Sequence, residues 1–306
     1  MERVVVIANP VASQFTGGSH RDVMAALAKT HEVEALWPGS ASEASEQARM
    51  AVSDGAAVVV AMGGDGMVHH VAQALVGTDS ALGIIPAGTT NVVARLLHIP
   101  SRHSRAVRLI ARAEEPRSIG TVRMNLQRGD TETVHHAVFA CGFGLDARVV
   151  QVADADPYRK YRFGSLHYAR SALGVGFRDF PSVKPHIVFT SDGQDARGTS
   201  ALIQFRSVYT YFGKIALRFG DEKPEPMSAL ILERLRRRHI PRIFFDALTH
   251  RDLDAIAGFQ VWKDIKTFDL VADPPVAAQA DGENLGMVDG AKLTWEGDSL
   301  KVLAGN

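Results

Sequence analysis

The chain has 306 residues, of which 46% are hydrophobic and 22% are charged, and its 34 basic side chains balance 34 acidic ones. This length and apolar content suffice for a large core and suggest two domains, with one large domain as the alternative. Zero formal charge argues against a protein whose main task is to neutralise nucleic-acid phosphates, so we expect no nucleic-acid partner.

The single cysteine, Cys141, excludes an internal disulfide and a multi-cysteine metal centre, and it fits a reducing compartment. The apolar run near the N-terminus is too short for a secretion signal and is typical of a first strand. No segment approaches the roughly 18 apolar residues that a membrane span needs. We therefore expect a cytoplasmic protein that is neither secreted nor integral to a membrane.

The first part of the chain alternates short apolar runs with stretches of helical spacing, which predicts a parallel sheet with helices on its faces. Strands are expected at residues 4–7, 34–36, 57–61 and 82–85. Helices are expected at residues 19–30, 41–53, 66–76, 91–97 and 102–113. Residues 1–115 are therefore predicted to form an α/β, Rossmann-like domain.

After Pro116 the pattern changes to short strands separated by turns, which predicts a mostly β, sandwich-like domain over residues 116–289. Its strands are expected at residues 118–127, 132–142, 186–190, 199–208, 214–219 and 229–232, with one helical region at 144–178. Residues 292–295 and 299–302 are expected to be two further short strands, so that 290–306 could pack back on the first domain.

Two glycine turns follow two of the predicted parallel strands. The strand at 57–61 runs into Gly63, Gly64, Asp65 and Gly66, and the strand at 82–85 runs into residues 86–91. Glycine lets a backbone approach a ligand closely, and the amides at a following helix N-terminus favour an anion. Because ligands of open α/β sheets lie at the carboxyl ends of the strands, the two turns predict a nucleotide site. The spacing lacks the third glycine of a dinucleotide fingerprint and the lysine of a P-loop.

Six short segments extend this pattern along nearly the whole chain, at residues 9–10, 63–66, 86–95, 142–147, 163–168 and 281–283. In that order they resemble the diacylglycerol kinase catalytic family, which includes soluble bacterial lipid kinases and the catalytic domains of sphingosine and ceramide kinases. The resemblance implies a magnesium- and ATP-dependent transferase of phospholipid metabolism. It would phosphorylate a lipid hydroxyl in a cleft between an α/β domain and a β-sandwich domain.

The resemblance also implies roles for particular residues. Those expected to bind ATP are Asn9, Gly63, Gly64, Asp65, Gly66, Met67, Thr89, Thr90, Asn91 and Arg95. Those expected to be catalytic are Glu283, Asp281 and Asp65, with Glu283 at the position usually assigned as proton acceptor. Asp65 would stand near Mg²⁺, and in sphingosine-kinase relatives the corresponding Asp is the preferred base. The structural metal site of the family has its nearest counterpart at Glu225, so Asp65 and Glu225 are the candidate metal ligands.

The chain departs from the family pattern at several positions, because Leu36, Met67, His69 and His70 stand where polar groups of other types are usual. Phosphorylation of diacylglycerol to phosphatidic acid is the leading interpretation, and a sphingoid base or another lipid is the next. The departures keep open a non-catalytic nucleotide- or lipid-binding relative. NAD kinase shares the glycine turn and the two-domain plan, but residues 186–232 lack its usual threonine-rich glycine segment.

An arginine-rich segment at residues 233–245 ends in large apolar side chains. We expect it to touch anionic headgroups, so that a lipid substrate at a membrane surface is reached by peripheral contact. The alternative is an ordinary solvated helix face. The sequence carries no signal for an oligomeric state.

Overall fold

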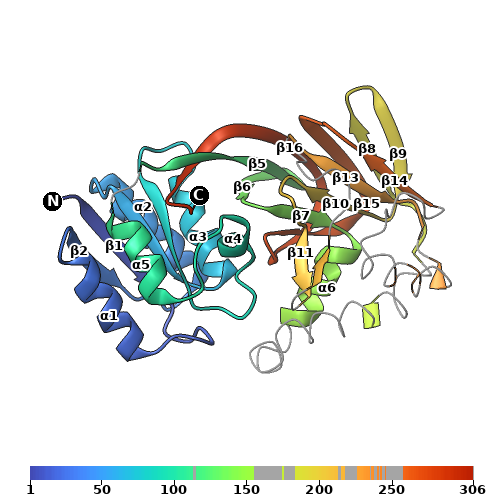
Figure 1. Ribbon diagram of the computed structural model, residues 1–306. Helices are drawn as coiled ribbons and strands as arrows, with labels where there is room; N and C mark the ends of the chain where they lie inside the picture. The colour runs from blue at the N-terminus through green and yellow to red at the C-terminus, as the bar shows by residue number, and fades with distance from the viewer. Residues whose placement is uncertain are drawn as a thin grey trace. The chain divides into compact units, whose positions relative to one another are not determined.

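The structure is a computed structural model that describes residues 1–112, 115–154, 174–175, 183–212, 215–217, 226–234, 236–237, 240, 242, 245 and 258–305. The chain divides into two compact units, which we describe separately (Figure 1). The first unit comprises Met1–Thr121 and Glu296–Asn306, and the second comprises Val122–Trp295. Within the described ranges, none of the helices combines the length and the apolar character needed to cross a bilayer.

The first unit is built on a parallel sheet of β1 (Arg3–Ala8), β2 (Glu32–Leu36), β3 (Val58–Gly63) and β4 (Ala81–Pro86). The strands lie in the order β4-β3-β1-β2, and Val302 at the end of β16 (Glu283–Val302) pairs in parallel with Leu82. Every residue of β3 and β4 is buried, as expected for strands that are covered on both faces.

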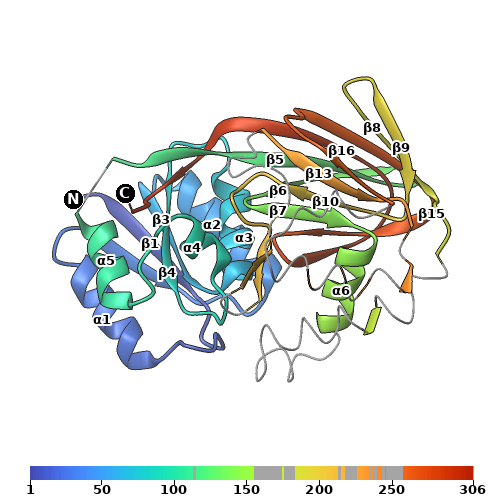
Figure 2. The same cartoon turned by 45° about the vertical axis from the view of Figure 1, so that its right-hand side comes forward.

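Helices cover the two faces of this sheet. They are α1 (Gly17–Leu27), α2 (Ala41–Ser53), α3 (Asp65–Leu75), α4 (Val92–Leu96) and α5 (His103–Ala111). Helix α1 packs with α5 and α2 packs with α3, on opposite sides of the strands (Figure 2). Thr16 caps α1 through a capping box with Ser19, and Ser40 caps α2 by accepting from the Glu43 amide. The predicted α/β class of this part of the chain is confirmed.

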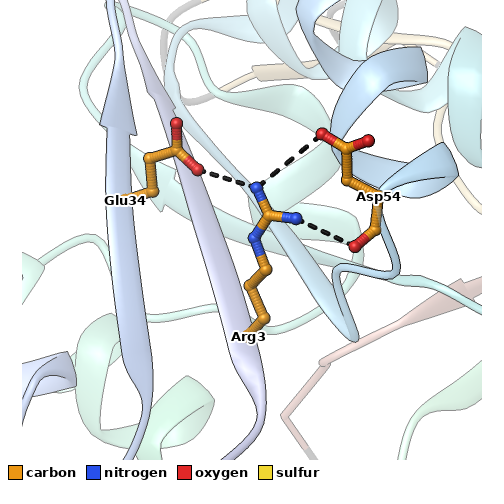
Figure 3. Close-up of polar contacts among 3 residues, drawn as sticks. All are labelled: Arg3, Glu34 and Asp54. Carbon is orange, nitrogen blue, oxygen red and sulfur yellow. Dashed lines mark hydrogen bonds and ion pairs between the residues drawn. The ribbon is translucent and has the colours of Figure 1, made fainter.

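At the amino-terminal edge of the sheet, Arg3 contacts Glu34 and Asp54 (Figure 3). The glycine turns follow β3 and β4 at the opposite, carboxyl edge. Its guanidinium donates to the Glu34 carboxylate on β2 at 2.9 Å and to the Asp54 carbonyl after α2 at 2.8 Å. The raised pKa of Arg3 follows mainly from its hydrogen bond to Glu34. Because these side chains are solvated, the contact fixes local register more than it adds stability.

The second unit is mostly β, as predicted. Its strands are β5 (Arg117–Arg128), β6 (Thr131–Ala137), β7 (Ala140–Phe143), β8 (Ile187–Ser191), β9 (Gln194–Gly198), β10 (Ser200–Gln204), β11 (Thr210–Phe212), β12 (Ile215–Leu217), β13 (Ser228–Leu232), β14 (Phe259–Trp262), β15 (Thr267–Ala280) and β16. The strands β5 and β16 also extend into the first unit. Helix α6 (Leu145–Asp154) follows β7 directly. The core contains Phe143, Phe189, Phe205 and Phe268, all fully buried.

Several strands differ from the predictions: the strand expected at 199–208 is the shorter β10, and β9, β11, β14 and β15 were not predicted. The strand expected at 132–142 is divided into β6 and β7, with Val138 and Phe139 between them. The two short strands expected at 292–295 and 299–302 are parts of the long β16. The sequence also hid β15, because Pro274 and Pro275 interrupt its pattern and proline cannot donate to a ladder.

The interruption of β15 separates two different pairings. Residues 269–272 pair with β8, whereas residues 278–280 pair with β7. Its register against β16 shifts between Val271 and Val276, and all these pairings are antiparallel. The part of the predicted helical region that the structure describes next to β7 is α6, and most of residues 155–182 lie outside the described residues.

Candidate functional site

In the first unit, three parallel strands end side by side in the segments that the sequence singled out. Asn9 follows β1, Gly64 follows β3 and Ala87 follows β4. The ladder continues past the strand ends, since the Asn9 amide donates to the Met62 carbonyl at 3.0 Å and the Ala87 amide donates to the Gly63 carbonyl at 2.8 Å. The two glycine turns and the loop that begins at Asn9 therefore lie at the same edge of the sheet.

The two glycine turns touch each other through their backbones. A Cβ atom added at Gly88 would lie 2.5 Å from the Cα of Gly64 and 2.9 Å from Oδ1 of Asn91. Asn91 holds the second turn shut, because its Oδ1 accepts from the Gly88 amide at 3.0 Å and its Nδ2 donates to the Gly88 carbonyl at 2.7 Å. A side chain at position 88 is therefore incompatible with this approach, whereas a Cβ at Gly64 would lie 3.3 Å from the Gly88 Cα and make a tight contact.

Asp65 joins the helices that follow the two turns. It is the first residue of α3, and its Oδ1 accepts from the Val93 amide in the first turn of α4 at 3.1 Å. The N-cap of α3 is Gly64, which makes no side-chain cap hydrogen bond. The first amides of a helix have no intrahelical acceptor and carry the positive end of its dipole. This end of α3 is therefore suited to an anion.

The remaining predicted nucleotide residues surround these turns. The exposed Thr89 lies with its Oγ1 3.1 Å from Oγ of Ser13 in the loop after β1. In the same loop, Oδ1 of Asn9 accepts from the Val11 amide at 3.0 Å. Met67 packs below Gly63, where an added Cβ would come within 2.7 Å of the Met67 Cβ.

The other members of the set are Gly66, half-buried in the first turn of α3, Thr90, half-buried in the turn after β4, and Arg95, exposed in the last turn of α4. The structure thus gathers the predicted nucleotide residues around the carboxyl edge of one sheet.

An aromatic cluster that the sequence did not reveal lies near the ends of β1 and β2. The ring of His20 lies 4.4 Å from that of Trp37 and 6.0 Å from that of Phe15, centroid to centroid. His20 is buried and its Nε2 has no hydrogen-bond partner among the described residues. Burial lowers the pKa of His20, so the ring favours its neutral form.

In the second unit, Asp281 and Gly282 form the two-residue turn between β15 and β16. Their φ angles are +54° and +82°, the left-handed conformation that a tight hairpin of this kind requires. Asp281 is only 3% exposed, and its carboxylate accepts from the amides of Val138 at 2.8 Å and Phe139 at 2.9 Å. The break between β6 and β7 is therefore organised by a carboxylate far away in the sequence.

Glu283 is half-buried and begins β16, directly after the turn. The strand behind it is fixed by Arg128, whose guanidinium donates to the carbonyl of Leu285 and, at 3.1 Å, to that of Met287. Gln151 of α6 donates to Asn284 Oδ1 at 3.3 Å. Both of these contacts stabilise the backbone that carries the Glu283 carboxylate.

Next to the turn lies a closed polar cluster of Asp146, Tyr209 and Gln279. The Tyr209 hydroxyl and Nε2 of Gln279 both donate to Oδ2 of Asp146, the second at 2.5 Å. Burial raises the pKa of Asp146, and the two hydrogen bonds act in the opposite direction. Asp146 belongs to a motif seen in the sequence, whereas Tyr209 and Gln279 carried no signal because only the fold brings them together.

Side chains that could ligate a metal are not clustered in the part of the chain that the structure describes. No group of three or more His, Cys, Asp or Glu side chains is placed to hold an ion there. The rings of His69 and His70 lie edge to face, with centroids 5.2 Å apart. The candidate ligand Glu225 and the segment 163–168 lie outside the described residues.

Comparison with known proteins agrees with the resemblance found in the sequence. Residues 3–124 match the family model described as the diacylglycerol kinase catalytic domain. A diacylglycerol kinase of Mycobacterium tuberculosis is 34% identical over 108 residues, which are 34% of this chain and 34% of that protein. The alignment thus spans about a third of the length of this curated relative.

Solved structures extend the likeness in fold to almost the whole chain. A diacylglycerol kinase of Bacillus anthracis superposes with a TM-score of 0.69 at 16% identity, covering 99% of this chain and 97% of that one. An NAD kinase of Archaeoglobus fulgidus, solved in complex with ATP, gives a TM-score of 0.50 at 12% identity over 98% and 92% of the two chains. These likenesses show the fold, and together with the sequence matches they confirm the family resemblance.

Proposed function

We propose that this chain transfers the γ-phosphoryl group of ATP to the free hydroxyl of diacylglycerol, giving phosphatidic acid. Its residues 3–124 match the family model described as the diacylglycerol kinase catalytic domain, which supports the proposal. The observation that carries the proposal is the backbone contact of the two glycine turns, Gly64 against Gly88, beside the uncapped end of α3. This arrangement supplies several amides within one small volume. Phosphoryl transfer depends mainly on such positioning and on charge neutralisation.

We assign the ATP phosphates to the amides at the start of α3 and to the turn held by Asn91. No side chain occupies the N-cap position of α3, so its amides can receive phosphate oxygens. Thr89 is exposed next to Ser13, and both hydroxyls can donate to an anion. In this proposal, hydroxyl and amide donors at this edge bind the phosphates, a task for which a P-loop enzyme uses a lysine.

In the first unit, Mg²⁺ would be held jointly by a protein carboxylate and the phosphates of the nucleotide. Kinases hold Mg²⁺ with one or two carboxylates together with substrate phosphates, and Asp65 supplies a carboxylate at the edge where we place those phosphates. When bound there, the ion would neutralise charge on the transferred phosphoryl group. A dedicated cage of protein carboxylates is not needed for this chemistry.

We assign proton acceptance to Glu283. The lipid hydroxyl gives its proton to this carboxylate as its oxygen bonds to the γ-phosphorus, while the bond from that phosphorus to the β–γ bridging oxygen breaks and ADP leaves. Asp281 precedes it by two residues, but its carboxylate is buried and accepts from backbone amides. We therefore assign Asp281 to holding the turn and Glu283 to the acceptor role.

We also propose that the chain meets its substrate at an anionic membrane surface. Arg234, Arg236 and Arg237 are exposed, and basic residues near such a surface contribute about 1 kcal/mol each. Sedimentation with vesicles containing phosphatidylglycerol tests this point. Binding should fall when Arg236 and Arg237 are changed to Gln, and unchanged sedimentation would contradict the contact.

The reaction itself is tested with the purified full chain, Mg²⁺ and γ-labelled ATP. Diacylglycerol, sphingosine and NAD⁺ are offered in parallel, and label is expected in phosphatidic acid. Glu283→Gln should reduce turnover by about 10²- to 10⁴-fold, the usual contribution of a general base. Arg3→Gln, at the opposite edge of the sheet, is the matched control and should keep full turnover. Label in NAD⁺ alone, or in no acceptor, would refute the proposal.

A further inference from the structure

The polar cluster beside the turn requires an unusual opening in the β-structure, which Gly142 supplies. A Cβ added at Gly142 would lie 2.6 Å from Oδ2 of Asp146, 2.9 Å from the Tyr209 hydroxyl and 3.2 Å from Nε2 of Gln279. The three polar atoms therefore occupy the space that any other residue at this position would fill. They come from α6, from the loop before β11 and from β15.

Hydrogen bonding fixes the orientation of the Gln279 side chain. Its Oε1 accepts from the Gly282 amide at 2.8 Å, and its Nε2 donates to Asp146 and lies 3.0 Å from the Tyr209 hydroxyl. The Tyr209 hydroxyl also donates to Asp146. A flipped amide would place a donor against the Gly282 amide, so only one orientation satisfies both sides. Gln279 thus connects the buried cluster to the peptide unit between Asp281 and Gly282, one residue before Glu283.

We propose that Gln279, oriented by Asp146 and Tyr209, is a positioning residue for Glu283. The inference rests on the proposed function. Gly282 is the one residue between Asp281 and Glu283, and because glycine restricts its own backbone least, its φ of +82° depends on the contacts around it. Asp281 anchors the turn on one side through the strand break, and Gln279 anchors it on the other through the Gly282 amide. The turn that leads into Glu283 is therefore held at two points.

Gln279 could stabilise the fold or position Glu283, and the two roles predict different effects of a substitution. If Gln279 only added stability, its loss would lower the melting temperature and leave turnover per folded molecule unchanged. If it positions Glu283, its loss lowers kcat while the KM for ATP stays constant, because the phosphate-binding turns belong to the other unit. Misplacing a catalytic group by about 1 Å can cost up to about 10²-fold in rate.

The test uses Gln279→Met and Tyr209→Phe in the full chain. Gln279→Met keeps the length of the side chain but loses its hydrogen bonds to Asp146, Tyr209 and the Gly282 amide. We expect kcat to fall at least tenfold with the KM for ATP within twofold. Tyr209→Phe keeps the ring and removes only the hydroxyl, so a smaller fall of about threefold is expected. If Gln279→Met does not fold, the kcat of Tyr209→Phe tests the proposal, and a value equal to that of the wild type would overturn it.

Gln260→Met is the matched control. Gln260 is a partly buried glutamine of the same unit, and its Nε2 donates to Glu233 at 2.6 Å, on β14 rather than beside the turn. Its loss should leave kcat unchanged. Deuterium exchange of peptides covering residues 279–285 gives a second readout, which does not depend on turnover. Exchange at the Gly282 amide should become faster in Gln279→Met and stay unchanged in Gln260→Met.

The outcomes distinguish the positioning role from the proposed function. If exchange at the Gly282 amide becomes faster in Gln279→Met but kcat is unchanged, the hydrogen bond from Gly282 to Gln279 exists and the positioning role is wrong. Unchanged exchange would overturn the hydrogen bond itself. A wild-type chain that phosphorylates no lipid refutes the proposed function, and this inference falls with it. A fall in kcat for Gln279→Met, with a kcat for Gln260→Met equal to that of the wild type, supports it.

Discussion

Replacing Asp281 with Asn is expected to destabilise the second unit, although the two side chains have nearly the same shape. The carboxylate is 3% exposed and accepts from the amides of Val138, Phe139 and Ala140 at distances of 2.8 to 3.3 Å. A hydrogen bond to a charged group contributes about 1.5–3 kcal/mol, and one to a neutral group about 0.5–1.5 kcal/mol. Losing about 1 kcal/mol at each of three amides gives a destabilisation of about 3 kcal/mol.

For a unit of this size, each kcal/mol shifts the melting temperature by about 2–4 °C, so Asp281→Asn should melt roughly 6–12 °C below the wild type. Calorimetry and urea unfolding both measure the change. Asp289→Asn is the control, because Asp289 accepts from one amide, that of Gly129, at an exposed site. Its effect should stay below about 1 kcal/mol. If Asp281→Asn melts together with the wild type, the amides do not depend on this carboxylate and our reasoning is wrong.

Three other predictions address the remaining buried groups. Because burial lowers the pKa of His20, the unfolded chain binds its proton more readily, so this residue makes stability fall as the pH drops below about 6.5. His20→Phe should lose less stability than the wild type between pH 7.5 and 5.5 in urea titrations, and equal losses would count against it. Gly88→Ala places a Cβ 2.5 Å from the Gly64 Cα and should abolish ATP binding in calorimetric titrations, whereas Gly17→Ala, with open space around it, should not. Burial raises the pKa of the Cys141 thiol, so a thiol reagent at pH 8 should label it only after denaturation, and rapid labelling of the folded chain would disprove its inertness.

Local signals in the sequence were enough to predict the first unit and the place of its turns. A buried strand, a glycine turn and a helix start follow one another twice, and parallel strands bring such turns to one edge. Neither the contact of Gly64 with Gly88 nor the hydrogen bond of Asp65 to Val93 could be read from spacing. Both depend on how closely two neighbouring strand ends approach.

The second unit was harder to predict, because its decisive contacts are distant in the sequence. The break after β6 has no turn residue of its own and is stabilised by Asp281, 143 positions away from Val138. Gln279 lies in a strand that Pro274 and Pro275 hide. A polar residue in a strand is ordinary, and the hydrogen bond of Gln279 to the Gly282 amide is visible only in the structure.

The discontinuous chain of the first unit also bears on its biosynthesis. Its sheet is extended by Val302, which pairs with Leu82, and the Ser299 carbonyl accepts from the Gly77 amide at 2.8 Å. A ribosome makes these last residues only after the whole second unit has left the peptidyl transferase centre. Until then the outer border of β4 presents bare amides and carbonyls, the kind of template onto which foreign strands add. During synthesis this border of β4 therefore stays open to the addition of another strand until Val302 pairs with it.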